Sequence, residues 1–123
     1  PAPVPALAPS AGLARAARDH AADQGPGGRT GHRGTDGSDV ATRISRYGTW
    51  ERTAAENISY GSDTPRDVVI GLLVDDGVPG RGHRANILSA ESRVAGVGCG
   101  SHAEYRTMCV IDFAGGYREA GGP

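Results

Sequence analysis

The C-terminal part of the chain constrains the fold more than any other stretch. Two apolar segments, Arg93–Cys99 and Arg106–Ala114, flank a polar stretch centred on Glu104. Antiparallel pairing about this centre places three pairs opposite each other, namely Cys99 with Cys109, Val97 with Ile111 and Ala95 with Phe113. Because one register matches the cysteines and the apolar residues on the same face, we expect a β-hairpin here.

The cysteines of this hairpin, Cys99 and Cys109, are the two that the chain contains. Their cross-strand position favours a disulfide over two buried free thiols. A disulfide implies an oxidising compartment. Closing so short a loop contributes no more than ~3 kcal/mol, so the bond fastens the hairpin without being the reason that the domain folds.

The opposite face of the hairpin indicates what surrounds the sheet. It carries residues without polar side chains, namely Gly96, Gly98, Met108 and Val110, so we expect the sheet to be covered on both sides. Periodicity predicts, in chain order, a helix from Ser10 to Gly25, a short helix from Val40 to Tyr47, a strand over Ala54–Tyr60 and a helix from Thr64 to Asp76. We therefore predict an α+β fold, an α-β-α sandwich with a three-stranded antiparallel sheet between helical layers.

Two details of the predicted helices bear on the site. Asp36 or Ser38 is expected to cap the second helix, because the spacing around Gly37 lacks the ligands of a calcium loop. His20 lies on the alanine-rich first helix, where a lone histidine is more often structural or solvent-facing than a ligand.

Composition limits the partners. The chain has 123 residues, a formal net charge of -1 and a pI of about 6.5, which gives no electrostatic basis for binding nucleic acid or an anionic membrane. No stretch approaches the ~20 apolar residues that span a bilayer. Aromatic residues make up 5%, so Trp50 and Phe113 are expected to be the large anchors of one small core. We expect an extended Pro-rich segment at 1–8, one domain at 9–117 and a flexible tail at 118–123.

Glu56 stands out within the predicted strand. Alternation places it on the same face as Ala54, Ile58 and Tyr60, which is the more apolar face. An unpaired carboxylate buried there would cost several kcal/mol. Glu56 must therefore be protonated, paired or hydrogen-bonded, unless the strand end is frayed and it points to water.

His83 lies at a sharp turn of the backbone. Asp75 and Asp76 close an apolar run, a Gly/Pro-rich turn follows, and His83 precedes the apolar segment that ends at Leu88. A histidine in such a place can bind a metal or transfer a proton.

Three blocks of this sequence resemble the CAP superfamily of cysteine-rich secretory, antigen 5 and pathogenesis-related proteins. Gly82–Leu88 followed by Val94–Gly98 resembles its hallmark, Gly31–Ser38 its first histidine segment, and Ala55–Ile58 its Gly-Glu-Asn-hydrophobic strand, with Ala55 in place of glycine. The blocks occur in the family's order over residues 10–117. The resemblance is to the bacterial, SCP-like type. It implies a secreted, extracellular domain, here without the family's usual first helix.

The resemblance also implies a cleft formed by His32, Glu56, Asp75 and His83, in which His32 and His83 hold a divalent metal. Asp76 competes with Asp75 as the second acid, because an aspartate stands where the family has a glutamate. Two imidazoles half fill a zinc site, so we expect zinc to be held weakly.

The function expected from these features is that of an extracellular binding or interaction module, whose ligand is a lipid, a peptide or a cell-wall component. The alternative is a metal-dependent, peptidase-like hydrolase with Glu56 as its base. A third interpretation is a buried hydrogen-bond network that only shapes the fold. The sequence contains no recognisable pattern for a catalytic nucleophile. It therefore favours a binding protein over an enzyme.

Overall fold

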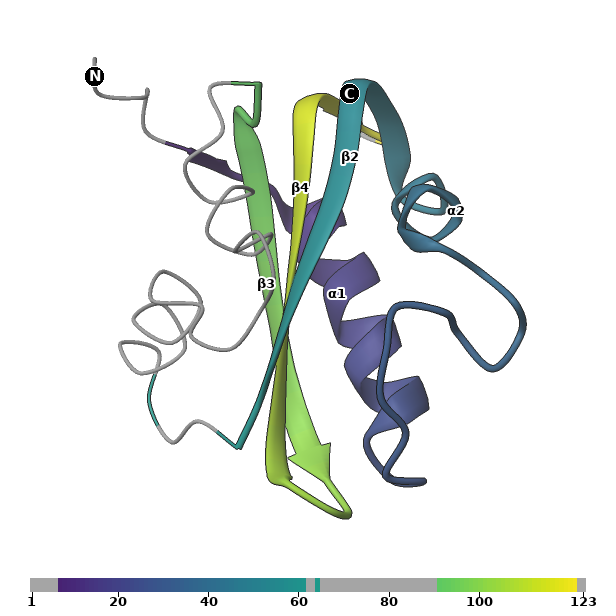
Figure 1. Ribbon diagram of the computed structural model, residues 1–123. Helices are drawn as coiled ribbons and strands as arrows, with labels where there is room; N and C mark the ends of the chain where they lie inside the picture. Colours follow the sequence, from purple (N-terminus) through teal and green to yellow (C-terminus); the bar gives the residue numbers. More distant parts are fainter. Residues whose placement is uncertain (1–6, 62–63, 65–90, 122–123) are drawn as a thin grey trace.

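The computed structural model describes residues 7–61, 64 and 91–121 (Figure 1). Its elements, in chain order, are β1 (Ala8–Pro9), α1 (Ala11–Gln24), α2 (Val40–Ile44), β2 (Gly48–Tyr60), β3 (Val94–His102) and β4 (Arg106–Glu119). The predicted helix from Thr64 to Asp76 lies outside the described residues, apart from Thr64 itself.

The sheet is mixed and four-stranded, with the order β1-β3-β4-β2. The three long strands are antiparallel, as the sequence predicted, but the parallel strand β1 was missed. β1 has two residues, Ala8 and Pro9, which pair with Val94 and Ala95 within a proline-rich stretch that the sequence indicated to be an extended linker. Proline at the sheet edge is compatible with this pairing, since an edge strand need not donate on both sides.

β2 begins at Gly48, earlier than the predicted strand. The register against β4 shifts between Glu51 and Ala54, and Arg52 in this irregularity has a positive φ of 70°. A bulge of this kind interrupts the period-two alternation, which explains why the sequence pattern revealed only the second half of the strand. β4 continues to Glu119, past residue 117 where the domain was expected to end.

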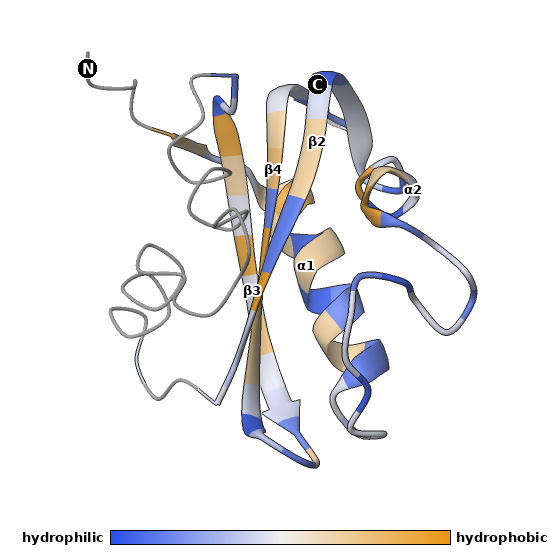
Figure 2. Cartoon of the chain, in the orientation of Figure 1, coloured by the Kyte–Doolittle hydropathy of each residue, from blue (hydrophilic) through white to orange (hydrophobic). Residues whose placement is uncertain are grey.

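The predicted hairpin register is confirmed. Cys99 pairs with Cys109, Val97 with Ile111 and Ala95 with Phe113. The two cysteines form a disulfide and their Cα atoms are 4.1 Å apart. In Figure 2 much of β3 and β4 is apolar, with a hydrophilic band in β4, and the tip of their hairpin is hydrophilic.

α1 lies against one face of the sheet, where it crosses β3 at very short range (Figure 1). A Cβ atom on Gly96 would lie 2.1 Å from the backbone N of Ala14, and one on Gly98 would lie 2.3 Å from that of Arg18. Glycine is therefore required at both positions for the helix to reach the sheet. The core on this face contains buried apolar side chains from α1, α2, β2 and β4, among them Leu13, Ala17, Ile44, Ile58, Met108 and Val110.

The caps explain where the helices begin. The Ser10 hydroxyl accepts from the Leu13 N–H at the start of α1, as expected. At α2 the prediction was wrong, because the cap is Asp39, whose carboxylate accepts from the Thr42 N–H. Asp36 instead accepts from the Ser38 N–H and closes the preceding turn. Aspartate and serine are common both at helix N-caps and in turns. Here Asp36 is used in the turn, and Asp39 is the N-cap.

The second face of the sheet also buries apolar residues. Ile111 and Phe113 form a cluster there with the partly buried Leu7, Ala55 and Ala95. Phe113 is the large anchor that the sequence predicted, whereas Trp50 is only partly buried. The helical layer predicted for this face lies outside the described residues. Within the described ranges, no helix has the length and apolar character needed to cross a membrane.

Candidate functional site

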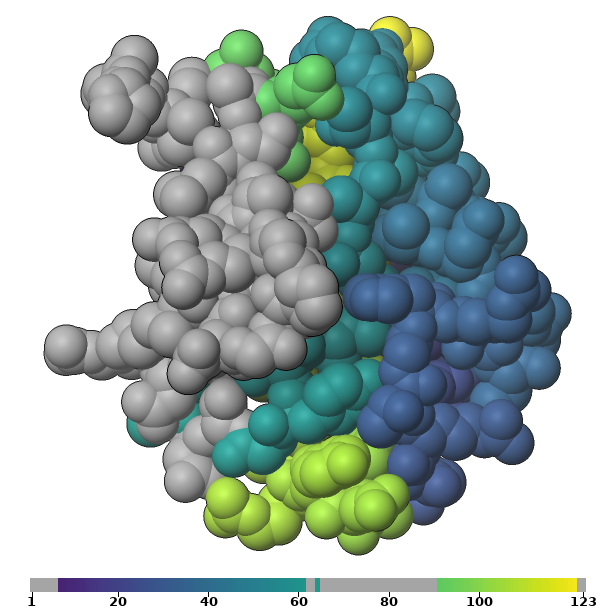
Figure 3. All heavy atoms as spheres, viewed as in Figure 1, coloured from purple at the N-terminus to yellow at the C-terminus, as the bar shows by residue number. Residues whose placement is uncertain are grey.

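The site is built around residues 29–32, a segment without helix or strand that hydrogen bonds hold in place. Its first part is fastened to the sheet. The Nε2 atom of His102, at the end of β3, donates to the Arg29 carbonyl over 2.8 Å. The N–H of Gly31 donates to the Tyr60 hydroxyl, at the end of β2, over 2.9 Å. In Figure 3 the dark blue atoms of this part of the chain border the lime-green tip of the β3–β4 hairpin.

The second part of the segment is fastened to the helices. Nε2 of His20 in α1 donates to the Gly31 carbonyl over 2.8 Å. Nη1 of Arg43 in α2 donates to the His32 carbonyl over 2.9 Å. The backbone that carries His32 is thus held by α1, α2, β2 and β3, although it belongs to none of them.

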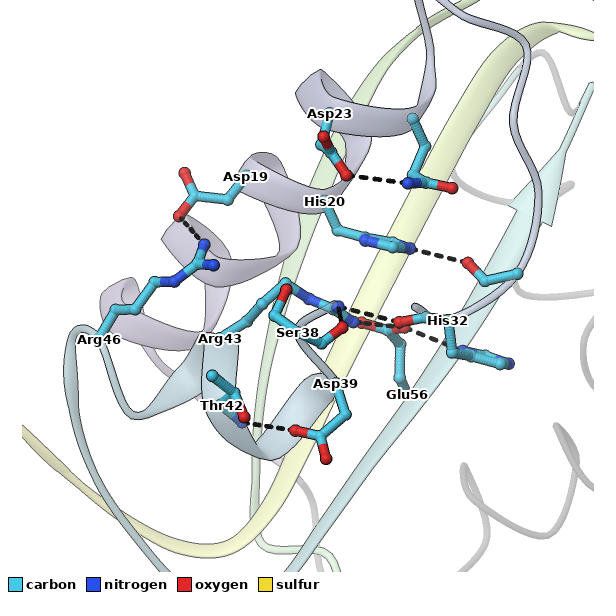
Figure 4. A network of polar contacts seen from close by, with 12 residues as sticks. Asp19, His20, Asp23, His32, Ser38, Asp39, Thr42, Arg43, Arg46 and Glu56 are labelled. Atoms are coloured by element: carbon cyan, nitrogen blue, oxygen red, sulfur yellow. Dashed lines mark hydrogen bonds and ion pairs between the residues drawn. The ribbon is translucent and has the colours of Figure 1, made fainter. Parts of the chain in front are cut away.

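Glu56, in the middle of β2, is buried and paired, which confirms the first of the two alternatives that the sequence left open. Its two carboxylate oxygens accept from Nη2 of Arg43 over 2.9 and 2.8 Å, and Oε1 also accepts from Nδ1 of His32 over 2.9 Å (Figure 4). Sequence reasoning did not single out Arg43, although it lies within the short helix predicted from Val40 to Tyr47. With 1% of its surface exposed, Arg43 is the buried cation that makes an ionised Glu56 tolerable.

A second carboxyl group that the sequence analysis missed lies beside Glu56. Asp112 of β4 is directly cross-strand from it and is fully buried. Burial, followed by the hydrogen bond to Glu56 and its charge, raises the pKa of Asp112 to about 10. Burial and the neighbouring carboxylate thus favour the protonated, neutral form of Asp112.

The ionisation of Glu56 follows from these partners. Burial alone would raise the pKa of Glu56, but hydrogen bonds from His32 and Asp112 and the charge of Arg43 hold it at about 2. The cluster therefore contains one anion, one cation and one neutral acid.

His32 is the solvent-facing member of this cluster. Its side chain is 55% exposed, while that of Glu56 is 2% exposed. Because Glu56 is an acceptor, neutral His32 carries its proton on Nδ1, which leaves the lone pair on Nε2. A histidine held in this way can bind a cation or accept a hydrogen bond through Nε2.

His20 proves to be a structural, fully buried histidine, consistent with the expectation from its helix. Burial lowers the pKa of His20, and the nearby charge of Arg43 lowers it further against the opposing effect of the Gly31 carbonyl. Beside it lies a polar hollow of about 280 Å³ between α1 and the loop before α2. The carboxylates at this hollow already have partners: Asp19 accepts from Tyr47, and Asp23 accepts from Thr35.

The structure brings two of the predicted cleft residues together. His32 and Glu56 are in contact although they are separated by 24 positions. His83, Asp75 and Asp76 lie outside the described residues, so their convergence on this pair stays a prediction. Within residues 7–61, 64 and 91–121, no three His, Cys, Asp or Glu side chains are grouped so that they could hold a metal ion.

The fold and the site define a small α+β domain with a disulfide-bonded β-hairpin, and two solved structures share its fold. An outer surface protein from Borrelia burgdorferi is similar with a TM-score of 0.74 and 18% identity, over 90% of this chain and 78% of that one. An extracellular protein containing an SCP domain from Bacillus anthracis is similar with a TM-score of 0.70 and 22% identity, over 90% of this chain and 34% of that one. At these identities the likeness shows the fold alone.

The family is shown by the sequence. Residues 1–113 match the model of "CAP: Cysteine-rich secretory protein family", and the chain belongs to this family. No curated protein matches the chain. Membership of a secretory family and the Cys99–Cys109 disulfide together identify an extracellular protein.

Proposed function

We propose that this domain is an extracellular binding module whose binding cleft is centred on His32. The observation that carries the proposal is the arrangement of His32, Glu56 and Arg43. Glu56 is committed to Arg43 and to Nδ1 of His32, so the group that the cluster presents to a ligand is Nε2 of His32. The fastening of residues 29–32 to four elements supports a preformed site, which lowers the entropic cost of binding.

The charge state of Glu56 supports binding over hydrolysis. An effective general base has a pKa near the operating pH, whereas the pKa of Glu56 is held at about 2. Its ion pair with buried Arg43 would have to weaken before Glu56 could take a proton from water. The hydrolase alternative with Glu56 as base is therefore disfavoured.

A divalent metal is part of the proposal, and the described residues fit it on the His32 side. A metal-binding histidine usually donates its other ring N–H to a carboxylate, and the Nδ1–H of His32 donates to Glu56 in this way. His83 is the proposed second ligand, and Glu56, engaged by Arg43, is not a ligand. With two protein ligands, zinc would be held weakly and would offer open positions to an anionic group of a lipid, peptide or cell-wall component.

Calorimetry with zinc alone tests this proposal. We expect weak binding to the wild-type chain that weakens as pH falls, because a protonated imidazole cannot bind a metal. His32→Ala should reduce the affinity at least tenfold. Arg33→Ala is the matched control, because Arg33 is an exposed neighbour in the same loop, and it should bind zinc as the wild type does. Unchanged affinity in a His32→Ala, His83→Ala double variant would contradict the proposal.

A substrate screen separates binding from catalysis. We expect no turnover of peptide, ester or glycan substrates at an enzymatic rate, with or without zinc. Turnover above roughly 1 s⁻¹ that vanishes in Glu56→Gln and in His83→Ala would establish the hydrolase instead.

A further inference from the structure

No motif points to Asp112, and its surroundings are unusual. It is fully buried in the middle of β4, with Glu56 beside it on β2 and Gly96 beside it on β3. Within the described part of the chain, neither of its carboxyl oxygens has an N–H or hydroxyl donor. A buried carboxylate in that position would be an uncompensated charge, which proteins do not sustain.

The charges around Asp112 favour one protonation state for the pair of carboxyl groups, Asp112 and Glu56. Among the described residues, Glu56 of β2 contributes an anion and Arg43 of α2 a cation that is already bound to Glu56 by two hydrogen bonds. α1 contributes His20, which is electrostatically coupled to Arg43 and Glu56, and β3 contributes only the uncharged Gly96. Two adjacent carboxyl groups with one cation are stable when they share one proton. The proton belongs on Asp112, since Arg43 and His32 both favour the charged form of Glu56.

We propose that Asp112 is a positioning residue of the His32 cleft, a neutral carboxylic acid that donates to Glu56 and fixes it between Arg43 and His32. Through Glu56 it fixes the ring of His32, with Nδ1 protonated and Nε2 turned outward. Asp112 itself touches no ligand. The inference rests on the proposed function only in its zinc measurement, because the tautomer of His32 and the stability of the chain are measured without metal.

Two substitutions test whether position 112 needs a neutral hydrogen-bond donor. Asp112→Asn keeps a neutral donor of the same shape, and Asp112→Val removes the donor and leaves an apolar side chain suited to a strand. ¹⁵N NMR of the imidazoles should show the Nδ1–H tautomer of His32 in the wild type and in Asp112→Asn, and a mixture of tautomers in Asp112→Val. Zinc affinity should stay within twofold in Asp112→Asn and fall about tenfold in Asp112→Val, as for other supporting residues of metal ligands.

The pH dependence of stability reports the shared proton directly. The folded chain holds a proton on Asp112 that the unfolded chain releases above about pH 4, so the wild type loses stability as pH rises from there. Asp112→Asn cannot release this proton. Between pH 5 and pH 7, the unfolding constant of the wild type should therefore rise about tenfold per pH unit relative to that of Asp112→Asn.

Val110→Ala is the matched control for packing. Val110 is fully buried, on the same strand and the same face as Asp112, but it lies next to Ile58 instead of Glu56. It should lower stability and leave the His32 tautomer and zinc affinity unchanged.

A wild-type tautomer in Asp112→Val, or the same loss of zinc affinity in Asp112→Asn as in Asp112→Val, overturns the proposal. If Asp112→Val does not fold, Asp112→Asn decides: an unchanged pH slope overturns the proposal. If the wild type binds no zinc, the proposed function fails while these metal-free measurements still test Asp112.

Discussion

On the sheet face that α1 covers, two neighbouring rows of cross-strand partners from β3, β4 and β2 are buried in different ways. Each row is called a rung. In both, the β3 residue is a glycine that lets α1 approach, and the other two side chains lie beneath the helix layer. The apolar rung is Gly98, Val110 and Ile58, and the polar rung is Gly96, Asp112 and Glu56.

The difference shows what each kind of burial requires. The apolar rung needs only complementary volume, and its stabilisation follows from the area removed from water. The polar rung needs a cation from α2, a shared proton and an outward histidine, and each depends on the others. An arrangement so demanding suits a site better than a core, which supports the binding proposal.

The largest expected effect comes from removing the cation of the polar rung. Arg43→Met leaves Glu56 buried without its partner and should lower the free energy of unfolding by about 4 kcal/mol, as breaking a buried pair does. Urea denaturation at pH 7 measures it. Arg46→Met is the control, because Arg46 is an exposed arginine close by in the chain, and it should cost about 0.5 kcal/mol. Equal effects of the two substitutions would remove the distinction between the rungs.

The next effect is the acid sensitivity of the polar rung. The pKa of Glu56 is lowered from 4.5 to about 2 in the folded chain. The stability from this carboxylate is therefore present above pH 4.5 and is lost as pH falls through about 2. The loss should be about 3 kcal/mol in the wild type and smaller in Glu56→Gln. In the apolar rung, Ile58→Ala should lower stability by the same amount at every pH, and a pH-dependent effect there would contradict the comparison.

The smallest effect tests the close approach of α1 to the glycine that each rung contains. In Gly98→Ala the new Cβ atom would lie 2.3 Å from the backbone of α1, which has to shift, so we expect a loss of about 2 kcal/mol. In Gly100→Ala, two positions along the same strand face, the new Cβ would lie 3.7 Å from the Ala21 side chain, an ordinary contact. That variant should be within about 0.5 kcal/mol of the wild type in thermal or urea unfolding.

The sequence predicted what periodicity and pairing determine. The β3–β4 register followed from matching two cysteines and their apolar neighbours, and α1 followed from Ser10 and the spacing of its apolar face. The burial of Glu56 followed from alternation along β2. Each of these depends on residues that are near in sequence or on one symmetric pairing.

The parts that were missed depend on contacts between distant elements. β1 is too short to have a period, and the bulge at Arg52 hides the first half of β2. Arg43 is one of 13 basic residues, and only the docking of α2 against β2 makes it the partner of Glu56. Asp112 did carry a signal, because alternation along β4 places an acid on the face of Met108 and Val110. Its meaning required the register of β2 against β4, which the sequence left open.

The fastening of residues 29–32 has a consequence for how the cleft opens. Most surface loops fluctuate independently of the core, and their amides exchange with solvent through small local openings. The amide of Gly31 is bound to Tyr60, and the carbonyls of Arg29 and Gly31 are bound to residues from β3 and α1. Releasing this amide requires those contacts to separate together. The segment that carries His32 therefore belongs to the cooperative unfolding unit of the domain, and its hydrogen exchange should be as slow as that of the neighbouring strands.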